Sequence, residues 1–303
     1  MDSEVNRKYV SSRGLLKMCA YHSETPSSSI SKIINYPNFV NFRNFVLQNR
    51  LIPTIYVCNR AIPSFQNEYL KQIDFPFVLL SGDSDEDMPK EVFNSIEDLK
   101  NFLENKYLLH WYCQNWLAGN HPKVTLMPIG MDYHTMVTSD MWGRRMSVEL
   151  QEKAIEDIKK LSKPFYEREI KCYINFLSTL GRRKDRKDAV DQIDKELVEY
   201  EKIGTARVNT WLNQIKYAFV VSPHGGGMDC HRTWEALILG CIPIVKRSPL
   251  DELYDELPVL IINDWSDITK ELLENTIEEF KQKEFNYDKL TLQYWIRRFQ
   301  TLK

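Results

Sequence analysis

The sequence lacks an excess of either charge and has no long apolar run. Its 303 residues carry 40 Lys and Arg against 42 Asp and Glu, which gives a formal net charge of -2. This balance excludes a global electrostatic footprint for nucleic acid, so any anion site must come from a local basic cluster. No stretch of about 18 uncharged apolar residues occurs, and the first residues are polar. We therefore expect neither a membrane span nor a signal peptide.

Metal-binding and disulfide patterns are also missing. The six cysteines show no CxxC spacing, and the six histidines show no HExxH or comparable spacing. We therefore expect reduced thiols in a cytoplasmic protein, with no disulfide framework and no zinc site. The length is sufficient for two α/β domains or one large one, and 43% hydrophobic residues is ordinary for a globular chain.

Strand patterns alternate with helical patterns along the whole chain. In the first half, apolar runs predict strands at 51–58, 75–80 and 124–129, and periodic segments predict helices at 39–48 and 95–106. In the second half, the same signals predict strands at 171–176, 219–221, 242–245 and 259–262, and helices at 183–199, 207–218, 230–239 and 267–282. Such alternation favours an α/β fold with parallel sheets, whose carboxyl edges hold the chemistry.

The charged, mostly helical segment 147–169 divides the chain into two predicted domains. We expect one domain over 1–160 and a second over 165–285. The last helix, within 286–303, carries a large apolar stripe, so we expect it to dock back against the rest of the molecule.

The segment 222–245, SPHGGGMDCHRTWEALILGCIPIV, carries the most informative pattern. Gly225, Gly226 and Gly227 lie between a predicted strand and a predicted helix, so the backbone there can approach a ligand closely. The free N–H groups and positive dipole end of that helix suit a phosphate. The alternative without a ligand is a glycine-rich turn capped by Asp229.

Charged residues on the same predicted helix add to this pattern. Arg232 can fork onto a diphosphate, and Glu235 can accept both hydroxyls of a ribose. Otherwise the two residues form an exposed ion pair, since they lie three apart on one helix face. His231, at the start of the helix, either contacts a phosphate or packs against its neighbours.

A second cluster, residues 181–187, has five basic residues in seven and follows the predicted strand 171–176. Basic side chains at a helix start oppose the helix dipole, so their placement makes more sense if an anion binds there. We predict that Arg182 and Arg186 contact the diphosphate. The alternative is a solvated basic helix start.

This segment resembles the donor-site signature of the exostosin family of glycosyltransferases. The resemblance rests on the glycine run, Asp229, Arg232 and the segments EAL (235–237) and GCIPIV (240–245). A weaker resemblance, through GDSDEDMP, WYCQNW and PIGMDYHT, is to compact members such as those of large algal DNA viruses. The resemblance implies a GT-B fold, two facing Rossmann-like domains with the active site between them. On this reading 1–160 is the acceptor-binding domain and 165–285 is the donor-binding domain. It also implies inverting transfer from a UDP-sugar without an essential metal. By analogy with compact relatives, the first expectation for the sugar is xylose.

The sequence Gly82-Asp83-Ser84-Asp85 follows the predicted strand 75–80. Asp83 faces the predicted cleft first, so we expect it to be the general base for an acceptor hydroxyl, with Asp85 as the second candidate. Two alternatives stay open: a metal-dependent transferase using this Asp-x-Asp motif, and turn-forming residues in an acidic loop.

Tyr133 and His134 follow another predicted strand and a glycine, and are the candidates for acceptor binding. The expected partners are therefore a nucleotide-sugar donor and a glycan acceptor. A non-catalytic module that binds nucleotides or glycans is the remaining alternative. It explains the pattern less well because a glycan binder needs no phosphate-facing set of residues.

Overall fold

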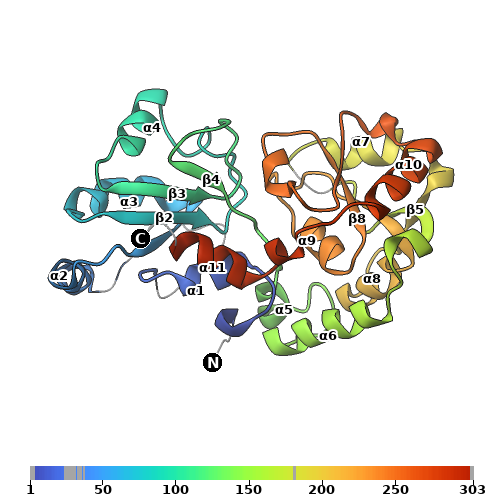
Figure 1. Ribbon diagram of the computed structural model, residues 1–303, viewed down its shortest axis with the longest axis horizontal. Coiled ribbons are helices and arrows are strands. Elements are labelled where there is room, and N and C mark those ends of the chain that lie inside the picture. The colour runs from blue at the N-terminus through green and yellow to red at the C-terminus, as the bar shows by residue number, and fades with distance from the viewer. Residues whose placement is uncertain (1–3, 24–31, 33–35, 37, 180–181, 301–303) are drawn as a thin grey trace.

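The computed structural model describes residues 4–23, 32, 36, 38–179 and 182–300, and contains two parallel sheets (Figure 1). The first sheet has the order β1-β2-β3-β4, from strands β1 (Thr54–Cys58), β2 (Phe77–Gly82), β3 (Leu108–Cys113) and β4 (Val124–Leu126). The second has the order β6-β5-β7-β8-β9, from β5 (Glu169–Ile174), β6 (Val198–Tyr200), β7 (Tyr217–Val221), β8 (Ile242–Lys246) and β9 (Leu260–Ile262). This is the mixed α/β fold that the alternating patterns predicted.

Two of these strands are absent from the sequence prediction. In β3 (Leu108–Cys113), exposed Leu109 and half-buried His110 stand between buried Leu108 and a buried end, so its pattern is neither alternating nor continuously apolar. β6 (Val198–Tyr200) is only three residues long and lies where a helix was expected to continue. That helix, α7 (Asp185–Gln192), ends early, and a short 3-10 turn leads into β6.

Helices connect and cover the strands. In the first half these are α1 (Ser12–Met18), α2 (Phe39–Asn49), α3 (Ile62–Glu68), α4 (Ile96–Leu103) and α5 (His134–Thr138). In the second half they are α6 (Val148–Leu161), α7, α8 (Arg207–Gln214), α9 (His231–Ile238), α10 (Lys270–Lys281) and α11 (Leu292–Gln300). None of the described helices has the length and apolar character needed to span a membrane.

The hydrophobic core is shared between the halves. Trp211 of α8 and Trp234 of α9 belong to the same buried cluster as the residues of the first sheet. The other face of the second sheet has its own smaller core, around Phe219 and Trp265. One face of the second sheet is thus joined through α8 and α9 to the first half of the chain.

Helix α11 returns to the first half after the second sheet is complete (Figure 1). It lies against α1, and the Tyr112 hydroxyl of β3 donates a hydrogen bond to the carbonyl of Arg298 at 3.1 Å. The rings of Tyr112 and Phe299 lie 4.5 Å apart. The apolar stripe of α11 is therefore buried against β3 and α1.

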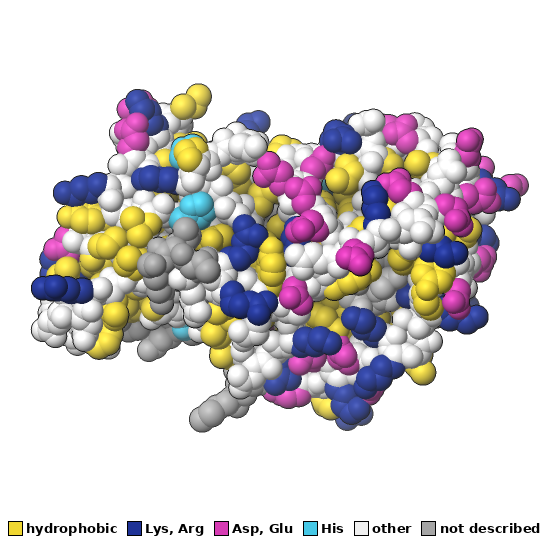
Figure 2. Space-filling view, viewed as in Figure 1, with side chains coloured by type: hydrophobic (Ala, Val, Ile, Leu, Met, Phe, Trp, Pro, Cys, Tyr) yellow, Lys and Arg dark blue, Asp and Glu magenta, His cyan; other side chains and the backbone are white. Residues whose placement is uncertain are grey.

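On the face of the molecule drawn in Figure 2, basic and acidic side chains are intermixed over both halves. This agrees with the near-zero net charge and leaves local arrangements of charge as the features to examine.

Candidate active site

The glycine loop lies where the strand order of the second sheet reverses. β5 is flanked by β6 on one side and by β7 on the other, so the connections that follow β5 and β7 leave on opposite faces. Such a switch point opens a crevice at the carboxyl ends of the two strands, which is where ligands bind in open α/β sheets. Residues 222–230 connect β7 to α9 at this crevice, and Asn175 and Phe176 follow β5 beside it.

Two arginine side chains meet at this crevice. The guanidinium carbon of Arg232 lies 4.9 Å from the Phe176 ring centroid, and that of Arg186 lies 5.9 Å from the same centroid. Arg232 Nε donates to Asn175 Oδ1 at 2.8 Å. Arg232 Nη1 and Arg186 Nε are buried and have no hydrogen-bond partner among the described residues.

Burial, and then the positive charge of Arg186, lower the pKa of Arg232 to about 10. Among the residues that the structure describes, neither guanidinium forms an ion pair with a carboxylate. Two like charges held together with unsatisfied donors form an arrangement that an anion would complete.

Side chains from other segments pack directly on the backbone of the glycine loop, residues 225–227. A Cβ atom at Gly225 would lie 2.8 Å from Arg186 Nη2, and one at Gly226 would overlap the Asp85 carboxylate. A Cβ at Gly227 would lie 2.9 Å from Asn115 Nδ2. Only glycine fits the first two positions without displacing these charged groups.

Arg182 and its neighbour Arg183 link the basic cluster to the acidic loop after β2. Arg182 donates to both carboxylate oxygens of Glu91, at 3.0 and 2.8 Å, and to the carbonyl of Asp85 at 2.9 Å. Arg183 forms an ion pair with Asp87 and donates to the carbonyl of Gly226. Arg182 thus lies beside the glycine loop, with its N–H groups bonded to residues of the acidic loop and to the carbonyl of Gly226.

Glu235 is buried and paired. Its Oε1 accepts from Arg207, with Nε at 3.1 Å, and its Oε2 accepts from Trp211 Nε1 at 2.7 Å. Arg207 also donates to the carbonyl of Asp132. The exposed Arg232–Glu235 pair considered as an alternative is therefore wrong. The predicted ribose contact stays a prediction, and it would require Glu235 to exchange one of these partners.

Asp83 lies directly after β2 in a left-handed conformation, with φ of 53°. Its carboxylate is 6% exposed, and Oδ2 has no hydrogen-bond partner among the described residues. Burial raises its pKa to about 6, even though Arg13, with Nε 3.8 Å away, acts in the opposite direction. Asp83 is thus a carboxyl group that changes its charge near neutral pH.

Other polar atoms near Asp83 are also buried without a partner among the described residues. These are Arg13 Nε, Tyr56 Oη and Gln114 Nε2. Gln114 Oε1 accepts from the backbone N–H of Asp83 at 3.0 Å. Sequence reasoning missed this group because its members come from α1, β1 and the end of β3.

A second charged group surrounds Asp132. Its carboxylate lies 3.1 Å from His134 Nδ1 and accepts from the backbone N–H of Thr135 at 2.9 Å. Burial alone would raise the pKa of Asp132, but His231, His134 and Arg207 hold it well below its usual range. Burial lowers the pKa of His134 to about 4, so its ring is neutral at pH 7.

The structure brings His231 to this group. Its Nδ1 donates to the carbonyl of Gly130 at 2.7 Å, and its ring centroid lies 6.4 Å from that of His134. Tyr133, in contrast, is 1% exposed, and its hydroxyl donates to Glu152 Oε1 at 3.2 Å. Of the two residues predicted for acceptor binding, only His134 offers an accessible side chain.

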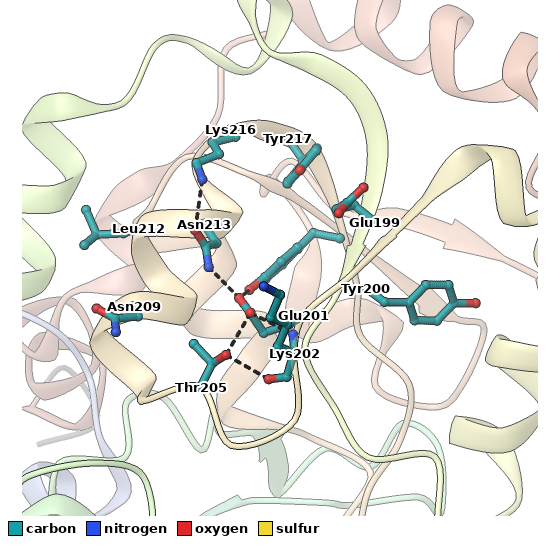
Figure 3. A pocket seen from close by; sticks show the side chains of 11 residues that line it. Glu199, Tyr200, Glu201, Lys202, Thr205, Asn209, Leu212, Asn213, Lys216 and Tyr217 are labelled. Atoms are coloured by element: carbon teal, nitrogen blue, oxygen red, sulfur yellow. Dashed lines mark hydrogen bonds between the residues drawn. The ribbon is translucent and has the colours of Figure 1, made fainter.

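A separate pocket with a volume of about 460 Å³ lies between β6 and α8. Figure 3 shows the side chains that line it. Glu201 is its central side chain and accepts hydrogen bonds from Tyr173, Asn213 and Thr205. None of the predicted site residues lines it. In the described part of the chain, no group of three or more His, Cys, Asp or Glu side chains is arranged to hold a metal ion.

Comparison with protein-family models finds no match, and no curated protein matches the chain. Among solved structures, the chain is similar to the catalytic domain of starch synthase IV from Arabidopsis thaliana bound to ADP and acarbose. The identity is 9%, the TM-score is 0.35, and the match covers 86% of this chain and 74% of that chain. A likeness at this level does not identify an activity.

Proposed function

We propose that this chain is a glycosyltransferase that binds the diphosphate of a nucleotide-sugar at the crevice between β5 and β7. The observation that carries the proposal is the pair Arg186 and Arg232, stacked on Phe176 with unpartnered buried donors. A diphosphate supplies two negative groups and several acceptor oxygens, which matches two convergent guanidinium groups. The N-terminus of α9, close beside them, adds backbone N–H groups that favour the same charge.

The reaction follows from where charge develops. As the bond between the sugar and the diphosphate breaks, negative charge grows on the leaving phosphate. Arg232 and Arg186 are the groups that stabilise it, because fixed cations in a dry site act most strongly on developing charge. The same two arginines thus bind the nucleotide-sugar and stabilise the nucleotide as it leaves.

Asp83 is the proposed general base for the acceptor hydroxyl. Its raised pKa, about 6, is suited to accepting a proton near neutral pH, and its Oδ2 is buried without a partner among the described residues. Asp85 is exposed and remains the second candidate. His134, whose side chain is accessible, is proposed to contact the acceptor.

Finer assignments rest on the exostosin-like motif. They are a UDP-sugar donor with xylose as first choice, inverting stereochemistry, and two GT-B domains facing across a cleft. No essential metal is proposed, because Arg186 and Arg232 would take the place of the ion at the diphosphate.

Calorimetric titration with UDP, ADP, GDP and their common sugar conjugates tests the proposal directly. We expect at least one nucleoside diphosphate to bind, and its sugar conjugate to be consumed when a glycan acceptor is supplied. Failure of the whole panel to bind to folded protein would contradict the proposed function.

A further inference from the structure

The acidic loop after β2 places a carboxylate on the glycine loop. The Asp85 side chain lies so close to Gly226 that a Cβ there would overlap it, and Asp85 Oδ1 would lie 3.3 Å from a Cβ at Gly227. Asp85 comes from the first half of the chain and the glycines from the second. A carboxylate from the first half of the chain therefore lies against the glycine loop of the second half.

Two basic side chains beside this contact are held by the same loop. Glu91 takes the fork of Arg182 with both oxygens, and Asp87 takes Arg183. Arg182 and Arg183 also donate to the carbonyl of Gly226. We call this set, Asp85, Asp87 and Glu91 with Arg182 and Arg183, the acidic clasp.

The clasp contacts have the geometry that phosphate oxygens would have. A carboxylate accepting a two-fold contact from arginine is the closest protein counterpart of a phosphate in the same fork. Arg182 outweighs the effect of burial and lowers the pKa of Glu91, so the pair is ionised at neutral pH. The side chains of Arg182 and Glu91 are 44% and 37% exposed, so they can exchange partners without unfolding.

We propose that the acidic clasp occupies the diphosphate site of the empty protein, and that a diphosphate binds by replacing Glu91 and Asp87 on Arg182 and Arg183. This inference rests on the proposed function, because it concerns the same anion site. We expect the exchange to involve side chains more than the main chain, since the N–H of Met88, between Asp87 and Glu91, donates to the carbonyl of Asn115 at 2.9 Å.

The exchange should make binding depend on whether an anion has enough phosphate oxygens to reach Arg182 and Arg183. An anion that reaches only Arg186 and Arg232 leaves the clasp in place, whereas one that also offers acceptors to Arg182 and Arg183 compensates for the contacts it breaks. Pyrophosphate and UDP are therefore expected to bind more tightly than inorganic phosphate and UMP. Removing the clasp carboxylates should improve the binding of pyrophosphate and UDP, and should leave the binding of phosphate and UMP unchanged.

A double-mutant cycle tests the exchange. Affinity for UDP and for pyrophosphate is measured by calorimetry for the wild type, Glu91→Gln, Arg182→Ala and the double variant. Glu91→Gln should tighten binding about two- to five-fold, the range expected for a partly exposed pair. It should have no effect when Arg182 is already alanine, because the competition is for that side chain. Glu97→Gln, an exposed carboxylate of α4, is the matched control and should leave affinity unchanged.

The outcomes separate this inference from the proposed function. If UDP binds to the wild type but Glu91→Gln binds it equally well or less tightly, the clasp is wrong and the proposed function stands. If Glu91→Gln tightens UDP binding equally with Arg182 present and with Arg182→Ala, the cause is the long-range electrostatic effect of removing a negative charge. That result also overturns the clasp. Absence of binding in every variant contradicts the proposed function, and the clasp with it.

Discussion

Arg207 and Arg232 both stack on aromatic rings beside helix α9, yet their polar surroundings differ. The Arg207 guanidinium lies 5.1 Å from the Trp142 centroid and 5.0 Å from that of Trp211, and Glu235 neutralises it. Arg232 lies over Phe176 with no carboxylate partner among the described residues. The aromatic platform is similar in both places, so the missing carboxylate is the informative difference.

The comparison of Arg207 with Arg232 distinguishes charged groups that stabilise the fold from charged groups that are proposed to bind a ligand. Around Arg207 the charged groups are paired, which makes this junction structural. Around Arg232, and near Asp83 in the other half, buried polar atoms lack partners within the described residues. Leaving such atoms unpaired costs stability, so their retention points to function. Substitutions at the first region should therefore affect folding, and those at the second should affect binding or transfer.

The largest effect on stability is expected for Glu235→Ala. It leaves the buried Arg207 without its counter-charge, so the free energy of unfolding should fall by about 3–5 kcal/mol. Urea unfolding measures this, and Glu235→Gln, which keeps one acceptor oxygen and the side-chain volume, should lose less. A Glu235→Ala protein of normal stability with weakened UDP binding would instead support the ribose contact predicted from sequence and blur the contrast between the two regions.

Asp83→Asn should reduce transfer by about 100-fold or more, the usual scale for removing a positioned base. Donor affinity should stay near normal, and asparagine tolerates the positive φ at this position. Wild-type transfer should rise with pH through about 6, because the base must lose its proton. Normal transfer by Asp83→Asn with loss in Asp85→Asn would move the assignment by two residues, and normal transfer in both would remove it.

The same variant also has a signature in stability. A folded-state pKa of about 6 means that the folded protein binds this proton more tightly than the unfolded chain. The contribution of Asp83 to stability is therefore greatest at low pH and is lost as the pH rises from about 4 to about 6. Asp83→Asn should unfold at a higher urea concentration than the wild type at pH 8 but not at pH 4.

Arg232→Lys should reduce transfer by about ten-fold or more while leaving the urea midpoint almost unchanged, because lysine keeps the charge but cannot fork onto a diphosphate. Arg247→Lys, an exposed arginine in the same half, is the matched control. If Arg232→Lys unfolds at a lower urea concentration but keeps full turnover, Arg232 is structural like Arg207. The proposed difference between the two arginines would then be wrong.

Chelation is expected to have the smallest effect. Transfer measured after treatment with EDTA should stay close to the untreated value, since arginines are proposed to contact the diphosphate. Complete loss that is restored by Mn²⁺ or Mg²⁺ would favour the Asp-x-Asp alternative and assign the acidic loop a metal.

The sequence predicted those parts of the fold and site that depend on neighbours along the chain. The strand-glycine-helix order around 217–238 and the crowding of basic residues near Arg186 are local patterns. The pairing of Glu235 with Arg207, 28 residues away, and of Arg182 with Glu91, 91 residues away, depends on the three-dimensional arrangement. Helix spacing alone placed Arg232 and Glu235 on one face, but the tertiary partner of Glu235 decided its surroundings.

The strand order also lay beyond the sequence. Alternating patterns give the number of strands only roughly, and they do not say that β5 lies between β6 and β7. That order creates the switch point at which Asn175 meets Arg232. Asn175 and Phe176 were therefore invisible as site residues, because nothing in their own segment distinguishes them from an ordinary strand end.

The shared core beneath α8 and α9 has a mechanical consequence. Trp211 and Trp234 pack in one cluster with the first sheet, and Asp229 accepts from the backbone N–H of Ile129 at 2.7 Å across the junction. Swinging the halves apart as rigid bodies would expose this apolar surface to water. We therefore expect the two halves to move and unfold together, because separating them would cost the burial of this shared surface.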